Sequence, residues 1–392
     1  MDELQMIREA YGEPEPPTPR QMTEARARVL AEPGLRRKRH GWRIKAGLGA
    51  VAAGAAVAVA VTVTGSGSPA PPSRVDLGRQ AVLAAAEKAA AQPTGTYWFS
   101  DRIDGQSYIV RAKTGGYAIV GAHFESFRWA GAKAGTGEAF YGRDLPARPL
   151  TPRDERLWRK AGSPAKFRVW SNDHYYTYDT SRTPWRANAP DPHGGGTWLN
   201  DDRTTEDILA LPADPGALAE MFFDPDESRE PAKPPTNERE RKLAEMRRQK
   251  REAVMGPRNK VLLVGRVLSG SPVPPDVRAA FIRALAAQPG ITAIGETADP
   301  LGRKGVALAS ASSTTKITAE WGAPPEEQGE FGSREEIIFD RATGGVLATQ
   351  RVLTAPGGPY RDREPGFVIS YGIVRDTGWT DTVPEPPAKP PF

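Results

Sequence analysis

A chain of 392 residues, of which 39% are hydrophobic and 26% are charged, is long enough for two or three domains. Its 40 glycines and 38 prolines argue against a long coiled coil, and the absence of cysteine excludes a disulfide framework, a zinc ribbon and a thiol nucleophile. The net charge of +5 divides into +3 on residues 1–45 and +2 on residues 65–392, which is not the strong basic excess of a nucleic-acid-binding domain. We therefore expect no nucleic-acid partner.

The beginning of the chain predicts a membrane anchor. Residues 46–64 (AGLGAVAAGAAVAVAVTVT) carry no charge and, at about 1.5 Å per residue, are long enough to cross a bilayer core. A basic flank with one aromatic anchor precedes them and predicts that this end is cytoplasmic: Arg36, Arg37, Lys38, Arg39, Trp42, Arg43 and Lys45. We expect a short cytoplasmic segment at 1–45, a transmembrane helix at 46–64, a flexible linker at 65–73 and an extracytoplasmic domain at 74–383. A cleaved signal peptide and a buried Ala-rich helix are the alternatives.

The segment after the linker predicts one helix and then a series of strands. Ser73 is a suitable N-cap for a helix that runs to Ala91, with Val75, Val82 and Ala86 on one side. Four short aromatic and β-branched runs follow at a spacing of about ten residues, which is typical of a β-meander: 96–100, 107–111, 117–120 and 124–130.

The middle of the chain mixes short helices with a hairpin. Thr151 as the cap and Pro152 at the first helical position predict a helix to about Lys160. The patterns that follow predict a hairpin at 167–170 and 174–180, a long loop at 181–203, short helices at 205–210 and 214–223, and an exposed charged helix at 239–252.

The last third predicts two helices and an antiparallel meander. A helix at 261–268 is favoured over a strand because Leu263 and Val267 pair at i,i+4, and 276–287 has a clear apolar stripe. Strands are expected at 291–296, 305–310, 314–321, 335–339, 346–353 and 367–374, followed by a disordered Pro-rich tail at 384–392. Because the elements do not alternate as βαβ, we predict an α+β fold, a curved antiparallel sheet with helices packed on one face, preceded by one transmembrane helix.

No catalytic motif is present in the sequence. There is no P-loop, no Gly-x-Ser-x-Gly and no His-Glu-x-x-His, and the four histidines have no partner at a metal-ligand spacing. The acidic run Asp224–Glu227 lacks the spacing of a calcium loop. We therefore predict no catalytic residue, no cofactor and no metal site.

Aromatic residues crowd into the first predicted meander. The ordinary explanation is a sheet core with cross-strand pairs. The alternative is a concave sheet that holds an acyl chain or another apolar ligand. The candidate surface for such a ligand comprises Tyr97, Phe99, Tyr108, Tyr117, Phe127 and Trp129.

Five short segments of the chain form a recognisable set: TEARARVL at 23–30, LPADPGAL at 211–218, VPPDVRAA at 273–280, QPGIT at 288–292 and GRKGV at 302–306. With these segments the chain resembles an uncharacterised family of single-pass membrane proteins from high-GC Gram-positive bacteria. These are mainly helix caps and turns, and the resemblance implies no activity. The expected outer domain is also weakly similar to the lipoprotein-carrier fold and to the outer domains of envelope-stress sigma regulators.

Together these features predict a single-pass protein of the cell membrane that is not an enzyme. Its extracytoplasmic domain would bind or sense a ligand, for which a lipid or a lipoprotein is the first expectation, beside the lipid bilayer. The alternative is a transmembrane regulator whose residues 1–45 bind a sigma factor or another cytoplasmic protein. An anchored hydrolase is a third reading.

Overall fold

The computed structural model describes residues 76–187, 190–198, 203–223, 255–389 and 391. The predicted cytoplasmic segment, its basic flank, the transmembrane helix at 46–64, the linker and the helix at 239–252 lie outside these residues. Within the described part of the chain, no helix combines the length and the apolar character needed to cross a membrane.

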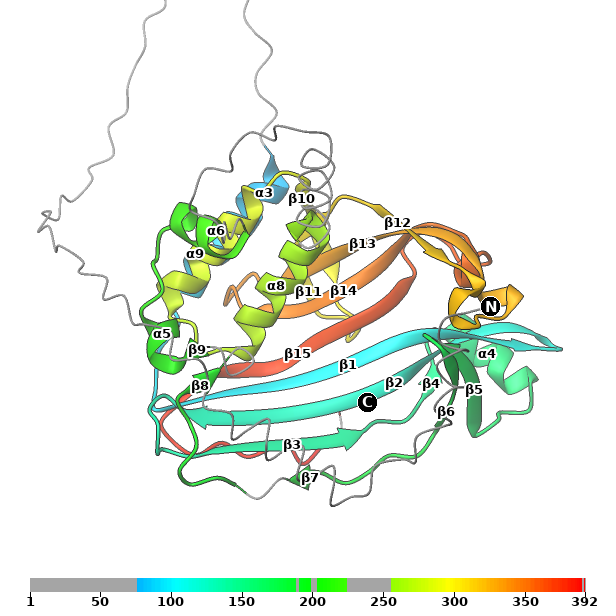
Figure 1. The fold of residues 1–392 in the computed structure, drawn as a ribbon, viewed down its shortest axis with the longest axis horizontal. Helices are drawn as coiled ribbons and strands as arrows, with labels where there is room; N and C mark the ends of the chain where they lie inside the picture. Colours follow the sequence, from blue (N-terminus) through cyan, green and yellow to red (C-terminus); the bar gives the residue numbers. More distant parts are fainter. Residues whose placement is uncertain (1–75, 188–189, 199–202, 224–254, 390, 392) are drawn as a thin grey trace, which may run out of the picture. The chain divides into compact units, whose positions relative to one another are not determined.

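Eleven strands of the described chain form one antiparallel sheet (Figure 1). Its main order is β10-β11-β13-β14-β15-β1-β2-β3-β7, with β12 beside β13 and β4 beside β2. The strands are β1 (Tyr97–Ala112), β2 (Gly115–Gly131), β3 (Glu138–Asp144), β4 (Arg148–Pro149), β7 (Arg186–Ala187), β10 (Ile291–Ala298), β11 (Lys304–Ser310), β12 (Ser313–Ile317), β13 (Gly329–Phe339), β14 (Val346–Ala355) and β15 (Val368–Thr380). The predicted α+β class with a large antiparallel sheet is confirmed.

The first and last long strands of the domain are neighbours. Strand β1 pairs with β15 from Tyr97 opposite Thr380 to Gln106 opposite Ser370, so the two predicted meanders belong to a single sheet. Two separate hairpins, β5 (Lys166–Ser171) with β6 (His174–Asp179) and β8 (Thr197–Trp198) with β9 (Arg203–Thr204), complete the strands.

The four short strands predicted between 96 and 130 are two long strands. Gly105 and Gly121, which resemble turn residues in the sequence, lie inside β1 and β2 where the register of the ladder shifts. A Cβ on Gly105 would lie 2.5 Å from Cζ of Tyr371, so the glycine is there to admit a ring rather than to turn the chain.

Six helices belong to the described residues: α3 (Leu77–Ala90), α4 (Pro152–Lys160), α5 (Thr205–Leu209), α6 (Pro215–Phe223), α8 (Pro257–Gly270) and α9 (Pro275–Ala286). The cap of α3 is Asp76, not the predicted Ser73, because its carboxylate accepts from the amide of Arg79 at 3.0 Å. The predicted Thr151 cap of α4 is confirmed. Residues 261–268 are helical within α8, as predicted.

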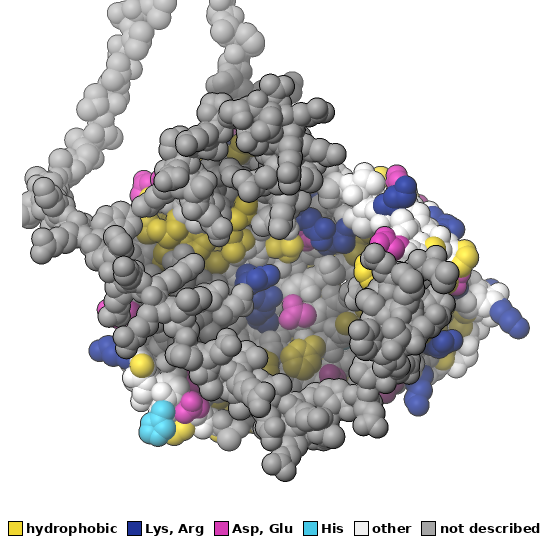
Figure 2. Space-filling model, viewed as in Figure 1, with side chains coloured by type: hydrophobic (Ala, Val, Ile, Leu, Met, Phe, Trp, Pro, Cys, Tyr) yellow, Lys and Arg dark blue, Asp and Glu magenta, His cyan; other side chains and the backbone are white. Residues whose placement is uncertain are grey.

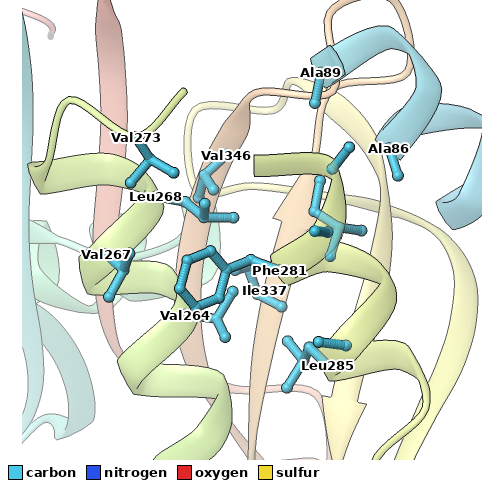
Figure 3. Packing of buried hydrophobic residues seen from close by; sticks show 14 of the residues in the cluster. Ala86, Ala89, Val264, Val267, Leu268, Val273, Phe281, Leu285, Ile337 and Val346 are labelled. Carbon is cyan, nitrogen blue, oxygen red and sulfur yellow. The ribbon is translucent and has the colours of Figure 1, made fainter. Parts of the chain in front are cut away.

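The main core lies between the helices and one face of the sheet, which we call the helix-side face. Figure 3 shows Phe281 of α9 among Val264, Val267 and Leu268 of α8, above Ile337 and Val346 of the sheet. All are buried, and together with Ala86 and Ala89 of α3 they join three helices to β13 and β14.

The opposite face, which we call the reverse face, has a core of its own. Ile103, Ala348 and Ile373 are fully buried there.

The Pro-rich segment for which the sequence predicts disorder makes two hydrogen bonds near β3 and β7. The carbonyl of Pro387 accepts from Nε1 of Trp185 at 3.0 Å, and that of Lys389 accepts from Nη2 of Arg143 at 3.3 Å.

Candidate functional site

The six aromatic residues predicted as a ligand surface lie in two separate clusters. Tyr97, Phe99, Phe127 and Trp129 come together on the reverse face of β1 and β2, where Phe127 and Trp129 are buried. The ring centroids of Tyr97 and Trp129 are 5.6 Å apart, and those of Phe99 and Phe127 are 5.9 Å apart. These distances are those of packed aromatic pairs.

Tyr108 and Tyr117 belong to the other face. Tyr117 is buried with Ile119 and Phe167, in a cluster to which Leu157 of α4 also belongs. The hydroxyl of Tyr108 lies 3.2 Å from Oγ of Ser171 and 3.2 Å from the hydroxyl of Tyr178. Tyr108 is therefore the one member of the predicted set that reaches the hollow described next.

A groove crosses the helix-side face between α8 and the β5–β6 hairpin. It consists of two adjoining hollows, of about 530 Å³ and about 250 Å³, which share Arg351 and Ser370 in their walls. We call it the central groove, the larger hollow its aromatic compartment and the smaller its arginine compartment. Figure 2 shows basic and acidic side chains gathered in the hollow of this face, beside hydrophobic ones.

Apolar and aromatic side chains line much of the aromatic compartment. They come from five strands and two short 3₁₀ helices, η1 (Ala319–Trp321) and η3 (Gly358–Tyr360): Tyr108, Ile109, Val169, Trp170, Ile317, Trp321, Phe331, Tyr360 and Ile369. Trp321 is 69% exposed, which is unusual for so large an apolar side chain. Burial raises the pKa of the Tyr360 phenol above its ordinary value, so this hydroxyl stays neutral.

The arginine compartment carries a positive balance of charge. Its walls include Arg102, Arg266 and Arg351 against the two carboxylates of Asp104 and Glu335. Glu335 is almost fully buried, and its Oε1 accepts from Nε of Arg258 at 3.0 Å, a fourth arginine that stands beside this wall.

Two of these arginines are held by hydroxyl groups of the sheet and of α8. Arg351 donates from Nε to Ser333 at 2.9 Å and from Nη2 to Thr315 at 2.6 Å. Arg102 donates to Oγ of Ser269 at 2.8 Å. Burial lowers the pKa of Arg351. Burial also raises the pKa of Glu335, and the charges of Arg258 and Arg351 oppose that rise. Arg102 and Arg351 are therefore pre-positioned, as an anion-binding wall requires.

Sequence reasoning did not find this groove. Arg102 and Arg351 are single basic residues on strands whose sequence pattern resembles that of the neighbouring strands. Trp321 stands among polar residues near a turn. The only signal was the aromatic crowding that included Tyr108. The predicted membrane-flank residues lie outside the described residues. Within the described part, no group of three or more His, Asp and Glu side chains converges as metal ligands would.

No protein-family model, no curated protein and no solved structure matches this chain.

Proposed function

We propose that this chain is a non-enzymatic, membrane-anchored binding or sensing protein, and that its outer domain holds an amphipathic acidic lipid in the central groove. One observation carries the proposal. A hollow with aromatic and aliphatic side chains among its lining residues opens into a hollow whose walls include three arginines. An apolar chain and an acidic head are the two halves of a ligand that would fill both.

The dimensions support a lipid-sized ligand. The aromatic compartment, at about 530 Å³, falls within the roughly 300–1,000 Å³ that small-molecule sites occupy. Burial of apolar ligand surface there is favourable by about 25 cal/mol for each Å² removed from water. The exposed ring of Trp321 stands in the wall of this hollow, where a bound chain would cover it.

The predicted anchor supports the same ligand class. A transmembrane helix at 46–64 would keep the domain beside the bilayer, where acidic lipids are abundant. The sheet would then curve around the bound molecule. A lipoprotein would be a larger ligand whose attached lipid supplies the same apolar part.

Native mass spectrometry of the full-length protein, extracted from a membrane-containing host in mild detergent, tests the proposal. We expect a released adduct with the mass of an acidic lipid. An apo mass, combined with no binding of a fluorescent fatty acid, would overturn the proposal and leave the cytoplasmic-partner alternative.

Two variants test whether the ligand binds in the central groove. Trp321→Ala should weaken binding of the fluorescent fatty acid about tenfold, which corresponds to a loss of about 1.4 kcal/mol. Arg266→Glu should weaken binding of a lipid with a negatively charged head, and should have little effect on binding of a neutral lipid. The controls are Leu77→Ala, an equally exposed apolar residue outside the groove walls, and Arg153→Glu, an exposed arginine of α4. Equal losses in the controls would contradict the assignment.

A further inference from the structure

A second cavity, of about 430 Å³, lies at the end of the sheet where β14 and β15 separate. The two strands pair from Ala348 opposite Ile373 onward, but Val346 and Leu347 have no partner in β15. The gap is walled by these two residues, by 374–379 of β15 and by the start of α9. None of its lining residues belongs to the central groove.

Arg278 of α9 reaches this cavity with an unsatisfied guanidinium. The residue is only 8% exposed. Its Nε donates to the carbonyl of Val273 at 3.1 Å, and its Cζ lies 4.4 Å from the centre of the Trp98 ring. Its Nη2 is buried and has no hydrogen-bond partner among the described residues. Burial lowers the pKa of Arg278 to about 10, with no acidic neighbour opposing it, so the side chain is still a cation at neutral pH.

Two more donors face the same shortage of acceptors. Trp98 and Trp379 both line the cavity, with ring centroids 5.5 Å apart. The Nε1 atoms of both indoles are buried and lack a hydrogen-bond partner within the described chain. Buried polar groups are normally hydrogen-bonded, so three orphaned donors around one cavity indicate an acceptor that the described part of the chain does not supply.

The other charged groups of the wall are already engaged. Oδ1 of Asp340 accepts from the amides of Ala342 and Thr343, and Oδ1 of Asp376 accepts from the amide of Thr377. Arg303 binds Asp299 and the carbonyls of Leu347 and Val374, and Arg375 donates to Glu125 at 2.8 Å. Among the described charged groups of this wall, Arg278 is therefore the one cation without a carboxylate partner.

We propose that this cavity binds a small organic carboxylate with an apolar body. The guanidinium and the two indole N–H groups would hold the carboxylate oxygens, and Val346, Val374 and the aromatic rings would contact the apolar part. One uncompensated cation matches one negative charge. Asp340 and Asp376 in the same wall oppose a doubly charged group such as a phosphate monoester.

Phenylacetate is the probe, and the indole N–H signals of the full-length protein with ¹⁵N-labelled tryptophan are the readout. We expect two indole signals to move as phenylacetate is added, and the melting temperature to rise with its concentration. Phenylacetamide, which has the same shape without the charge, should bind at least tenfold more weakly. Trp379→Phe should remove one of the two moving signals and weaken binding severalfold, because it keeps the ring and deletes the donor.

Arg278→Met should abolish the response to phenylacetate. Its matched control is Arg283→Met on the same helix, which removes a surface partner of Glu87 and should leave the response intact. The proposal is overturned if phenylacetate moves no indole signal at tens of millimolar, if Arg278→Met still responds, or if inorganic phosphate moves the two signals and phenylacetate does not. None of these results depends on the central groove, so they leave the lipid proposal untouched.

Discussion

The arginines on the two sides of the sheet have opposite surroundings. On the reverse face, Arg143 and Arg375 converge on the fully buried Glu125, at 2.5 Å and 2.8 Å. On the helix-side face, Arg278 lies against Trp98 with no carboxylate within 4 Å among the described residues. Burial of charge is therefore not by itself a functional signal. The arginines around Glu125 have their counter-charge within the fold, whereas Arg278 has none among the described residues.

Removing the charge of Glu125 should change the stability of the fold more than any other substitution considered. Glu125→Gln leaves the buried Arg143 and the half-buried Arg375 without their shared counter-charge, and should lower the free energy of unfolding by about 3–5 kcal/mol. Urea denaturation at pH 8 measures it. Glu296→Gln, an exposed acid 3.8 Å from Lys304, is the control and should change stability by less than about 1 kcal/mol. Similar effects of the two substitutions would contradict the view that the buried cluster holds the fold together.

Asp101 is a second acid in the cluster that Glu125 forms with Arg143 and Arg375. Burial and the charge of Glu125 raise its pKa from 3.8 to about 7, and Arg375, 3.8 Å away, only partly offsets them. The folded protein therefore holds a proton that the unfolded chain loses above about pH 4. Stability falls as pH rises from about 4 to about 7, by at most roughly 4 kcal/mol.

Asp101→Asn should remove this slope. The variant should be more stable than the parent at pH 8, and the two should have nearly equal stability at pH 4. Urea denaturation of both proteins across this range measures the difference. His123, whose pKa burial lowers to about 4, adds an opposite slope below pH 6.5, but it is common to both proteins and cancels in the comparison. A variant that is less stable than the parent at pH 8 would show that the Asp101 charge is compensated.

Arg278→Met should have the opposite sign to Glu125→Gln. Removal of an unpaired buried charge relieves its desolvation, so the ligand-free variant should be more stable by about 1–3 kcal/mol, even though the contact with Trp98 is lost. Thermal and urea unfolding without added carboxylate measure this. A destabilised variant would indicate that Arg278 is satisfied within the fold, which would weaken the case for an outside acceptor.

The sequence predicted the elements better than the contacts between them. The caps and patterns of α4, α9 and the last strands act over a few residues, so Thr151 and the apolar stripe at 276–287 could be interpreted locally. Gly105 and Gly121 were misleading because a glycine inside a bulged strand and a glycine in a turn look alike in sequence. Only the pairing of β1 with β15, about 270 residues apart, makes one sheet of the two predicted meanders.

The candidate sites depend on these long-range contacts. Arg278 lies in a stretch that the sequence predicts as a helix start, and nothing local shows that its guanidinium ends beside Trp98 and Trp379. The aromatic crowding was real, but Phe99 and Tyr108, which the sequence predicts on two separate strands, lie in the one strand β1. Its regular alternation sends them to opposite faces. A pattern without a register cannot separate those two outcomes.

The smallest effect concerns a third buried charge, Asp154 of α4. Its Oδ1 accepts from the amide of Ala118 at 2.7 Å and from Nη1 of Arg363 at 2.8 Å. Its Oδ2 accepts from the hydroxyl of Thr151 at 2.6 Å, and that hydroxyl caps the helix by accepting from the Asp154 amide.

Thr151→Ala deletes the cap and one of the hydrogen bonds to Asp154 but leaves the charge of Asp154 paired with Arg363. The free energy of unfolding should fall by about 1 kcal/mol, and Thr151→Ser should restore it, as urea denaturation will measure. A loss of more than about 3 kcal/mol would mean that the ion pair with Arg363 does not compensate the carboxylate. Asp154 would then be a buried charge without sufficient partners, like Arg278, and not a buried charge compensated within the fold, like Glu125.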